Sequence, residues 1–325
     1  MDLFFLDYRD PLVGLIFITI LIFVVALINY FWRFFIYKDE EEKLEKFIKK
    51  FELNNIHKDL LRDPNLSLDN LIFLASIFTR SGEFEKAIQI YLIALEKVKD
   101  KKEQEGIFIS LAEAYFKAGF LERSKEVLLN ALKIRPRNER ALKLLKIVYL
   151  RLRSYKEVLN TLECLLELDE EVKEEKEFIK ALIIKDQDME QKNKLELILN
   201  LDIKDNAMLQ RFIFENYQII KEQNLFDIID LLYKDQKLIK IDKQEYKEFF
   251  YALNLLPKEE KIFIKNQNFR MFKILKNNEF KVKMVFSYMC LDCKNIMPLF
   301  FYHCPICYSF NKCKILYEVK LDETN

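Results

Sequence analysis

Four cysteines near the carboxyl end are the residues whose spacing points most directly to a chemistry. Cys290 and Cys293 enclose two residues, ten residues follow, and Cys304 and Cys307 enclose two more. Each Cys-x-x-Cys turn directs two sulfurs toward one ion, and two facing turns give the tetrahedral set of four thiolates that Zn²⁺ favours, with metal–sulfur distances of about 2.3 Å. Because four protein ligands leave no position for water, we expect a structural zinc ion and no hydrolysis.

The same four thiols could also bind iron, form disulfides or act as a redox pair. Iron can occupy the same four sulfurs, and the spacing does not separate iron from zinc. Disulfides would require an oxidising compartment. A redox dithiol needs only one Cys-x-x-Cys pair, so two facing pairs favour a shared metal ion.

The remaining thiols and both histidines have simpler expected roles. Cys313 could compete as a ligand, but a thiol outside the two turns is more often buried or free, and Cys164 is predicted to be a small core residue. His303 is expected to pack or hydrogen-bond beside the metal, and His57 to lie on the surface. Three aromatic residues between the turns predict either a small core of the knuckle itself or a contact patch: Phe300, Phe301 and Tyr302.

The composition excludes several other kinds of site. Only 4 Gly and 6 Pro occur among 325 residues, and the glycines stand singly, which argues against Gly-rich phosphate-binding loops and turn-dense all-β folds. The 53 Lys+Arg and 52 Asp+Glu give a net charge of +1, so we expect no nucleic-acid partner. With 2 His and no distinguishable acid/base pair of carboxylates, we expect no enzymatic activity.

An uncharged segment near the amino terminus predicts a membrane anchor. Residues 12–32 contain no charged side chain and end in Tyr30, Phe31 and Trp32. As a helix the segment would span about 31 Å, close to the thickness of a hydrocarbon core. A cleaved signal peptide would begin with basic residues, whereas this chain begins with acidic ones, so we expect a retained single-pass anchor.

The distribution of Lys and Arg predicts the orientation of this anchor. Arg9 alone precedes it, and six basic residues follow it between 33 and 50. By the positive-inside rule, the amino terminus lies in the periplasm and the body lies in the cytoplasm. A reducing compartment agrees with four thiols held as metal ligands.

A helical repeat occupies the middle of the chain. The first copy contains Leu71, Leu74, Ala75, Phe78, Gly82, Ala87, Tyr91 and Ala94, and the second contains Phe108, Leu111, Ala112, Tyr115, Gly119, Ser124, Leu128, Ala131 and Pro136. A fainter third copy contains Leu142, Leu145, Tyr149, Leu162 and Leu165. These patterns resemble the tetratricopeptide repeat, in which small residues let paired helices approach and large residues fill the layer between neighbours. An insertion around residues 101–104 lengthens the step between the first two copies.

The chain therefore predicts a mainly α-helical protein, an α-solenoid that ends in a small zinc ribbon. Its expected parts are an amino-terminal tail and anchor (1–36), a helical stalk (37–66), recognisable repeats (67–172), degenerate helical repeats (173–283) and the four-cysteine knuckle (284–325). Repeats of this kind present extended surfaces to peptides or helices of other proteins. The sequence does not identify which surface is used, the client or the oligomeric state.

The order of anchor, repeats and terminal cysteine turns resembles the lipopolysaccharide assembly protein B (LapB, YciM) family of Gram-negative inner membranes, over the whole chain. The resemblance is most specific at Tyr-Met-Cys-Leu-Asp-Cys (288–293) and Tyr-His-Cys-Pro-Ile-Cys (302–307), which are similar to the family's rubredoxin-like knuckle. Lys294 stands where that family usually has Gly, a departure at the turn and not at the ligands.

The resemblance implies a non-enzymatic inner-membrane adaptor. Members of that family work with the membrane protease FtsH to promote destruction of the lipid A pathway deacetylase, and an inner-membrane lipid A sensor opposes them. The resemblance also implies that Cys290, Cys293, Cys304 and Cys307 hold the metal and that the knuckle docks onto the repeats. The alternative is a general membrane-anchored repeat scaffold for another envelope protein assembly.

Overall fold

The computed structural model describes residues 18–25, 27–28, 60–63, 65–168, 171–204, 206–219, 223–236, 238, 241–256 and 262–322. The chain divides into two compact units, Met1–Arg153 and Ser154–Asn325. Much of the predicted anchor and nearly all of the predicted stalk lie outside the described residues. Residues 18–25 and 27–28 are helical and exposed. Within the described part of the chain, none of the helices combines the length and apolarity that a membrane crossing requires.

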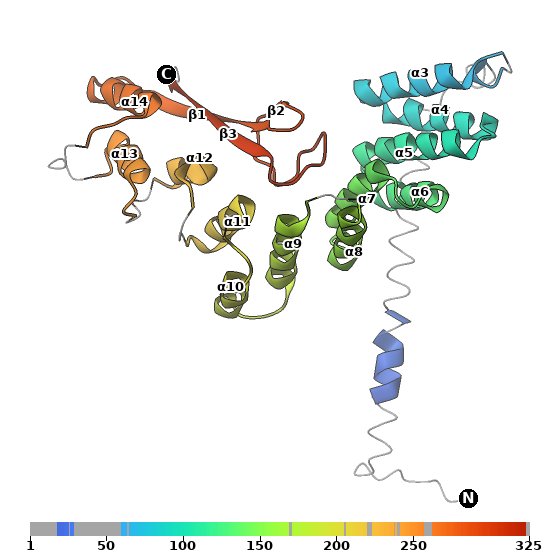
Figure 1. Ribbon diagram of the computed structural model, residues 1–325, viewed down its shortest axis with the longest axis horizontal. Coiled ribbons are helices and arrows are strands. Elements are labelled where there is room, and N and C mark those ends of the chain that lie inside the picture. The colour runs from blue at the N-terminus through green and yellow to red at the C-terminus, as the bar shows by residue number, and fades with distance from the viewer. Residues whose placement is uncertain are drawn as a thin grey trace, which may run out of the picture. The chain divides into compact units, whose positions relative to one another are not determined.

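The amino-terminal unit is a stack of helix pairs (Figure 1). Each helix packs on the next along the chain, and α5 also contacts both α3 and α7. This pattern is typical of a solenoid, in which every helix pair touches only its neighbours. The helices are α3 (Leu68–Ser81), α4 (Phe84–Lys97), α5 (Lys101–Ala118), α6 (Leu121–Ile134) and α7 (Glu139–Arg151).

Small residues stand where the helices meet, as the repeat pattern predicts. Ala75 on α3 and Ala112 on α5 are 0% exposed. At the α5–α6 crossing the buried Ser124 hydroxyl donates to the Ala112 carbonyl at 2.8 Å. Gly82 and Gly119 end α3 and α5 in the left-handed region, with φ of 83° and 89°. Glycine reaches this region without a Cβ penalty, so each repeat can turn sharply into its second helix.

The predicted insertion between the first two repeats lengthens a helix. Residues 101–104 form the first turn of α5, and the Asp100 carboxylate caps that turn by accepting from the backbone N–H groups of Lys102 and Glu103 at 3.0 Å each. This cap satisfies donors that a helix start otherwise leaves open. The 37-residue step from Phe78 to Tyr115 is therefore accommodated by a longer helix and not by an extra loop.

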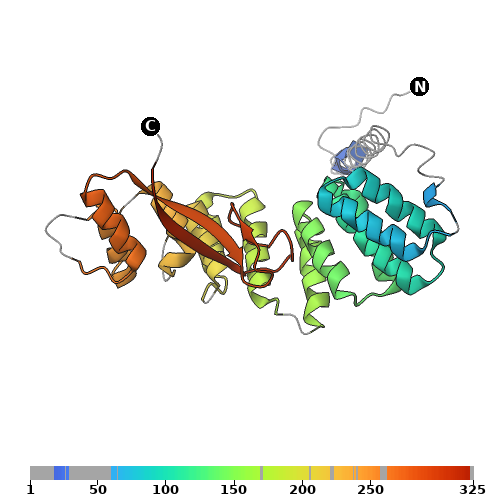
Figure 2. The same ribbon diagram turned by 90° about the horizontal axis from the view of Figure 1, so that it is seen from above.

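The carboxyl-terminal unit combines helices with a small sheet, seen also from above in Figure 2. The region from residue 173 that was expected to hold degenerate helical repeats is helical as far as Asn277. The helices are α8 (Tyr155–Leu166), α9 (Lys173–Asp186), α10 (Gln191–Leu199), α11 (Ala207–Tyr217), α12 (Leu225–Asp235), α13 (Gln244–Ala252) and α14 (Gln267–Asn277). The strands are β1 (Val282–Cys290), β2 (Ile296–Met297) and β3 (Cys313–Leu321).

The sheet is antiparallel, in the order β2-β1-β3, and extends well beyond the cysteines. Val282 pairs with Leu321 at one end, and Cys290 pairs with Cys313 at the other. Alternate side chains of β1 point to opposite faces. Met284, Tyr288 and Cys290 are buried on the face that packs against α12 and α14. This packing joins the ribbon and the helices in one hydrophobic core.

Candidate metal centre

Two turns of the same local geometry carry the four cysteines. In the first turn the Lys294 N–H donates to the Cys290 carbonyl at 2.9 Å, and in the second the Tyr308 N–H donates to the Cys304 carbonyl at 2.9 Å. The N–H groups of Cys290 and Cys304 close the turns by donating to the carbonyls of residues 295 and 309, at 2.9 and 3.0 Å. The two Cys-x-x-Cys motifs have the same spacing and therefore form turns with the same backbone hydrogen bonds.

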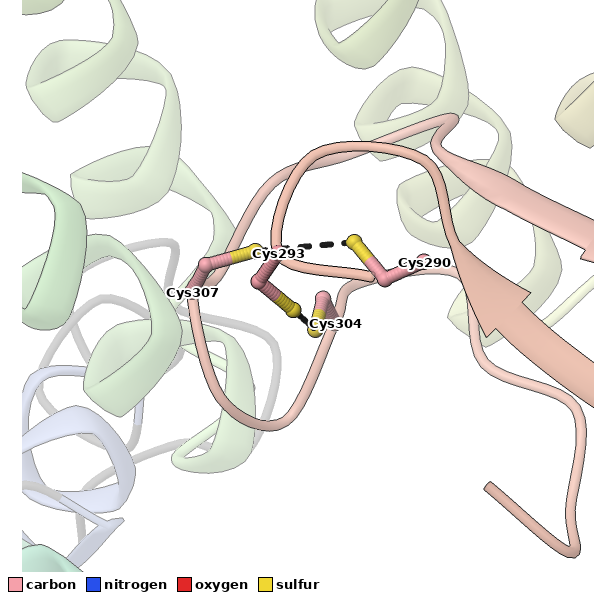
Figure 3. A group of neighbouring side chains, drawn as sticks. All are labelled: Cys290, Cys293, Cys304 and Cys307. Carbon is pink, nitrogen blue, oxygen red and sulfur yellow. Dashed lines mark hydrogen bonds between the residues drawn. The ribbon is translucent and has the colours of Figure 1, made fainter. Parts of the chain in front are cut away.

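The two turns bring the four thiols together (Figure 3). The ligand sulfurs of Cys290, Cys293, Cys304 and Cys307 all lie within 4.8 Å of one another. The Sγ atoms of Cys290 and Cys307 are 3.6 Å apart, as are those of Cys293 and Cys304. A tetrahedron with metal–sulfur bonds of about 2.3 Å has sulfur–sulfur edges of about 3.8 Å. The cluster therefore fits a structural metal ion bound by four thiolates.

The surroundings of the thiols differ within each turn. Burial raises the pKa of Cys290, and it raises the pKa of Cys304 to about 12. At Cys293 burial also acts to raise the pKa, but hydrogen bonds from Asn295 and the neighbouring thiols outweigh it and lower the pKa to about 6. Ionising the two buried thiols is costly unless a cation sits beside them. A divalent ion would offset that cost.

The other thiols lie outside the cluster. Cys164 is exposed on α8, so the prediction of a core residue was wrong. On this helix the buried positions are Val158, Thr161, Leu162 and Leu165, and Cys164 falls outside this buried stripe. Cys313 is partly buried on β3, opposite Cys290 in the strand register. Burial raises its pKa to about 11.

Lys294 occupies a strained position in the first turn. Its φ is 60°, and Tyr308, at the equivalent place in the second turn, has φ 63°. A side chain costs about 1–2 kcal/mol in this left-handed region, and glycine escapes the penalty. We therefore expect Lys294→Gly to stabilise the metal-loaded knuckle by about 1 kcal/mol, measured by denaturant unfolding. The control is Lys312→Gly, because Lys312 is exposed and is not among the residues with positive φ. This substitution should not raise the free energy of unfolding.

A buried network fixes the ribbon to the helices beside the thiol cluster. Arg211 of α11 is 2% exposed, and its Nη1 and Nη2 atoms donate to the two carboxylate oxygens of Asp230 on α12, at 2.8 Å each. The hydroxyl of Tyr288, two residues before Cys290, donates to the same carboxylate at 2.8 Å. The guanidinium carbon of Arg211 lies 3.6 Å from the centre of the Phe300 ring. This geometry combines a bidentate ion pair with a cation–π contact.

All three nitrogen atoms of the Arg211 guanidinium donate hydrogen bonds. Its Nε atom donates to Glu215 at 2.9 Å, and Nη1 also donates to the Asp227 carbonyl at 2.8 Å. Burial acts to lower the pKa of Arg211, but the hydrogen bonds and charge of Asp230 and the charge of Glu215 outweigh it and raise the pKa. Arg211 therefore stays cationic in the core, where an unpaired charge would be very unfavourable.

The segment between the two turns packs on α9 and α11. Tyr302 stacks on Phe178 of α9 with ring centres 4.7 Å apart, and its hydroxyl donates to Glu215. His303 forms a buried contact of 2.7 Å between Nε2 and the Glu175 carboxylate, so it hydrogen-bonds beside the cluster, as expected. Of the two roles expected for the aromatic residues, a core of the knuckle itself or a contact patch, Tyr302 thus has the second, and the contact is with helices of the same chain.

The helix residues that contact the ribbon could not be predicted from the sequence. Glu175, Arg211 and Asp230 are charged residues on amphipathic helices, where such residues usually face solvent. Their ribbon partners His303, Phe300 and Tyr288 are 128, 89 and 58 residues away along the chain, so no local spacing relates them. The one available signal was Phe178, an aromatic residue in the apolar stretch at residues 178–184.

The amino-terminal unit contains a segment that is similar to a known protein family. The family described as tetratricopeptide repeat matches residues 71–105, which include most of α3, all of α4 and the start of α5. No curated protein matches the chain. The matched repeat, the stacked helix pairs and the small residues at their crossings together fit a tetratricopeptide-repeat protein.

Proposed function

We propose that this protein is a non-enzymatic adaptor that holds other proteins on a helical scaffold. The observation that carries the proposal is the tetratricopeptide repeat at residues 71–105, within a stack of helix pairs. Such stacks recognise peptides or helices through extended surfaces and contain no chemistry of their own. A scaffold or adaptor role follows from this architecture.

The thiol cluster supports the same role as a structural element. Cys290, Cys293, Cys304 and Cys307 would hold one ion, for which we propose zinc, with iron as the alternative for the same ligands. The ion would supply folding energy to the two turns. Arg211, Asp230 and Glu175 would then hold the loaded knuckle against α9, α11 and α12.

We further propose that the adaptor acts at the bacterial inner membrane. The uncharged segment at residues 12–32 and the excess of basic residues after it support a single-pass anchor with the body in the cytoplasm. A tether raises the effective concentration of the scaffold near other membrane proteins without any new contact. A scaffold tethered in this way would lie close to a membrane protease, which we propose as its partner.

For the client, we propose the lipid A pathway deacetylase, presented to an FtsH-like protease and opposed by a lipid A sensor. The support is the order of anchor, repeats and paired cysteine turns, together with the segments 288–293 and 302–307, which are similar to the LapB family. Adaptor-driven proteolysis of the deacetylase would limit lipopolysaccharide synthesis. Neither an active site nor a nucleic-acid surface is needed for this role.

Depletion of the protein tests this function. We expect deacetylase abundance to rise on depletion, measured by quantitative immunoblotting, because the client is no longer delivered to the protease. Re-expression of the unaltered chain or of Cys164→Ser should restore the low level, and Cys290→Ser should not. Unchanged deacetylase abundance would contradict the proposal and favour a scaffold for another envelope assembly, whose client affinity capture would identify.

A further inference from the structure

The sheet has an outward face that the described helices do not cover. Because side chains alternate along β1, the burial of Met284 and Tyr288 against the helices places Val285, Ser287 and Met289 on the other side. On β3 the residues in register with this side are Lys314, Leu316, Glu318 and Lys320. We call this side the outer ribbon face.

An apolar stripe runs along the outer ribbon face toward the metal centre. Met289 lies in register between Ile296 of β2 and Lys314 of β3. The Leu291 N–H donates to the Lys312 carbonyl at 2.7 Å, which continues the β1–β3 ladder by one residue and places Leu291 on the same face. Ile296 is 60% exposed and Leu291 is 42% exposed. These are large apolar side chains that the chain leaves open to solvent.

Unpaired positive charge borders the metal end of this stripe. Among the described residues, Lys312 and Lys314 form no ion pair, and both are exposed. The lysines at the other end are different, because Lys320 contacts Glu318 at 3.2 Å and Lys283 contacts Asp322 at 2.7 Å. The face therefore offers apolar contact at its centre and two available ammonium groups beside it.

We propose that the outer ribbon face docks an amphipathic segment of a client protein, with apolar residues flanked by Asp or Glu. The inference rests on the proposed adaptor function and assigns its client contact to this face. The stripe from Val285 to Leu291 is about 20 Å long, which matches a helix of about 14 residues. Acidic side chains of the client would pair with Lys312 and Lys314, and its apolar side chains would cover Met289, Leu291 and Ile296.

A membrane surface fits the same face less well. Segments that lie in the lipid interface typically present Trp or Phe with many Lys or Arg. The outer ribbon face carries Val, Met, Leu and Ile, and Glu318 stands within it. Methionine at the centre of an apolar surface adapts to the side chains of a protein partner.

Site-specific photo-crosslinking in the full-length, membrane-bound chain tests the inference. A benzophenone amino acid is placed at Ile296, at Ile274 of α14, which is similarly exposed at 54%, and at Phe73 of α3 in the repeats. We expect Ile296 to crosslink to a client segment that mass spectrometry shows to be apolar with flanking acidic residues. We expect Ile274 not to crosslink to it. The double variant Lys312→Glu/Lys314→Glu should lower the yield from Ile296 at least tenfold.

The variant Lys192→Glu/Lys204→Glu is the charge-matched control, because both lysines are exposed and lie in the same unit. It should leave the yield unchanged, and unchanged metal content shows that the double variants fold. Crosslinks from Ile296 to lipid, or a yield that does not depend on Lys312 and Lys314, would overturn the inference. A client captured from Phe73 but not from Ile296 would overturn it and leave the adaptor function standing. No protein captured from either position would contradict both.

Discussion

Cys290→Ser is expected to abolish stable metal binding and to unfold the carboxyl-terminal ribbon. Cys290 is 0% exposed and ends β1, so its loss removes a ligand and leaves a hydroxyl in the core. A structural zinc site contributes about 10–16 kcal/mol to folding, and a three-ligand site keeps only part of it. Metal content should fall to background, and hydrogen exchange over residues 282–321 should accelerate by several orders of magnitude.

Two other cysteines provide the controls for this substitution. Cys164→Ser alters an exposed thiol in the same unit, and Cys313→Ser alters the cross-strand neighbour of Cys290 outside the cluster. Both variants should keep one ion per chain and the exchange protection of β1. A Cys290→Ser protein with undiminished metal content and protection would show that the cluster does not hold the ribbon together.

Arg211→Ala should destabilise the carboxyl-terminal unit by about 3–5 kcal/mol. The substitution leaves the buried Asp230 carboxylate without its counter-charge and removes the cation over the Phe300 ring. The effect should appear as a lower free energy of unfolding, reported by denaturant titration and by exchange at α11, α12 and β1. The knuckle should also bind its ion more weakly, because its contact with the helices is lost.

The matched control is Lys173→Ala, which breaks the exposed Lys173–Asp202 pair in the same unit, where the side chains are 83% and 49% exposed. Its effect on the free energy of unfolding should be too small to resolve, because exposed ion pairs contribute little to stability. The double variant Arg211→Met/Asp230→Leu removes both charges and should recover part of the lost stability, since it no longer leaves a buried Asp230 carboxylate without its counter-charge. A loss under 1 kcal/mol for Arg211→Ala alone would refute the role of this network.

The features that could be predicted from the sequence are those set by local spacing. Two residues between cysteines define each cysteine turn, and the ladder of small and large residues around Ala75 and Ala112 defines the helix crossings. In both cases the interacting groups are close along the chain or repeat with a fixed period. Gly82 and Gly119 likewise marked their turns, because the left-handed backbone selects glycine.

The features that could not be predicted depend on distant contacts. Asp230 and Tyr288 lie 58 residues apart, and only the folded ribbon brings them together. Cys164 was misplaced because it sits beside Leu165 and Leu166 in the sequence, yet the helical turn exposes it. The long strands β1 and β3 were also not anticipated, since only the knuckle at their end carries a motif.

The proposed thiol-bound ion would hold the two cysteine turns together at the end of the ribbon. X-ray absorption at the metal edge of the purified full-length protein, combined with elemental analysis, tests for this ion. We expect one ion per chain, zinc, with four sulfur neighbours at about 2.3 Å. Protein purified without any ion, with Cys290, Cys293, Cys304 and Cys307 joined in disulfides, would contradict this expectation.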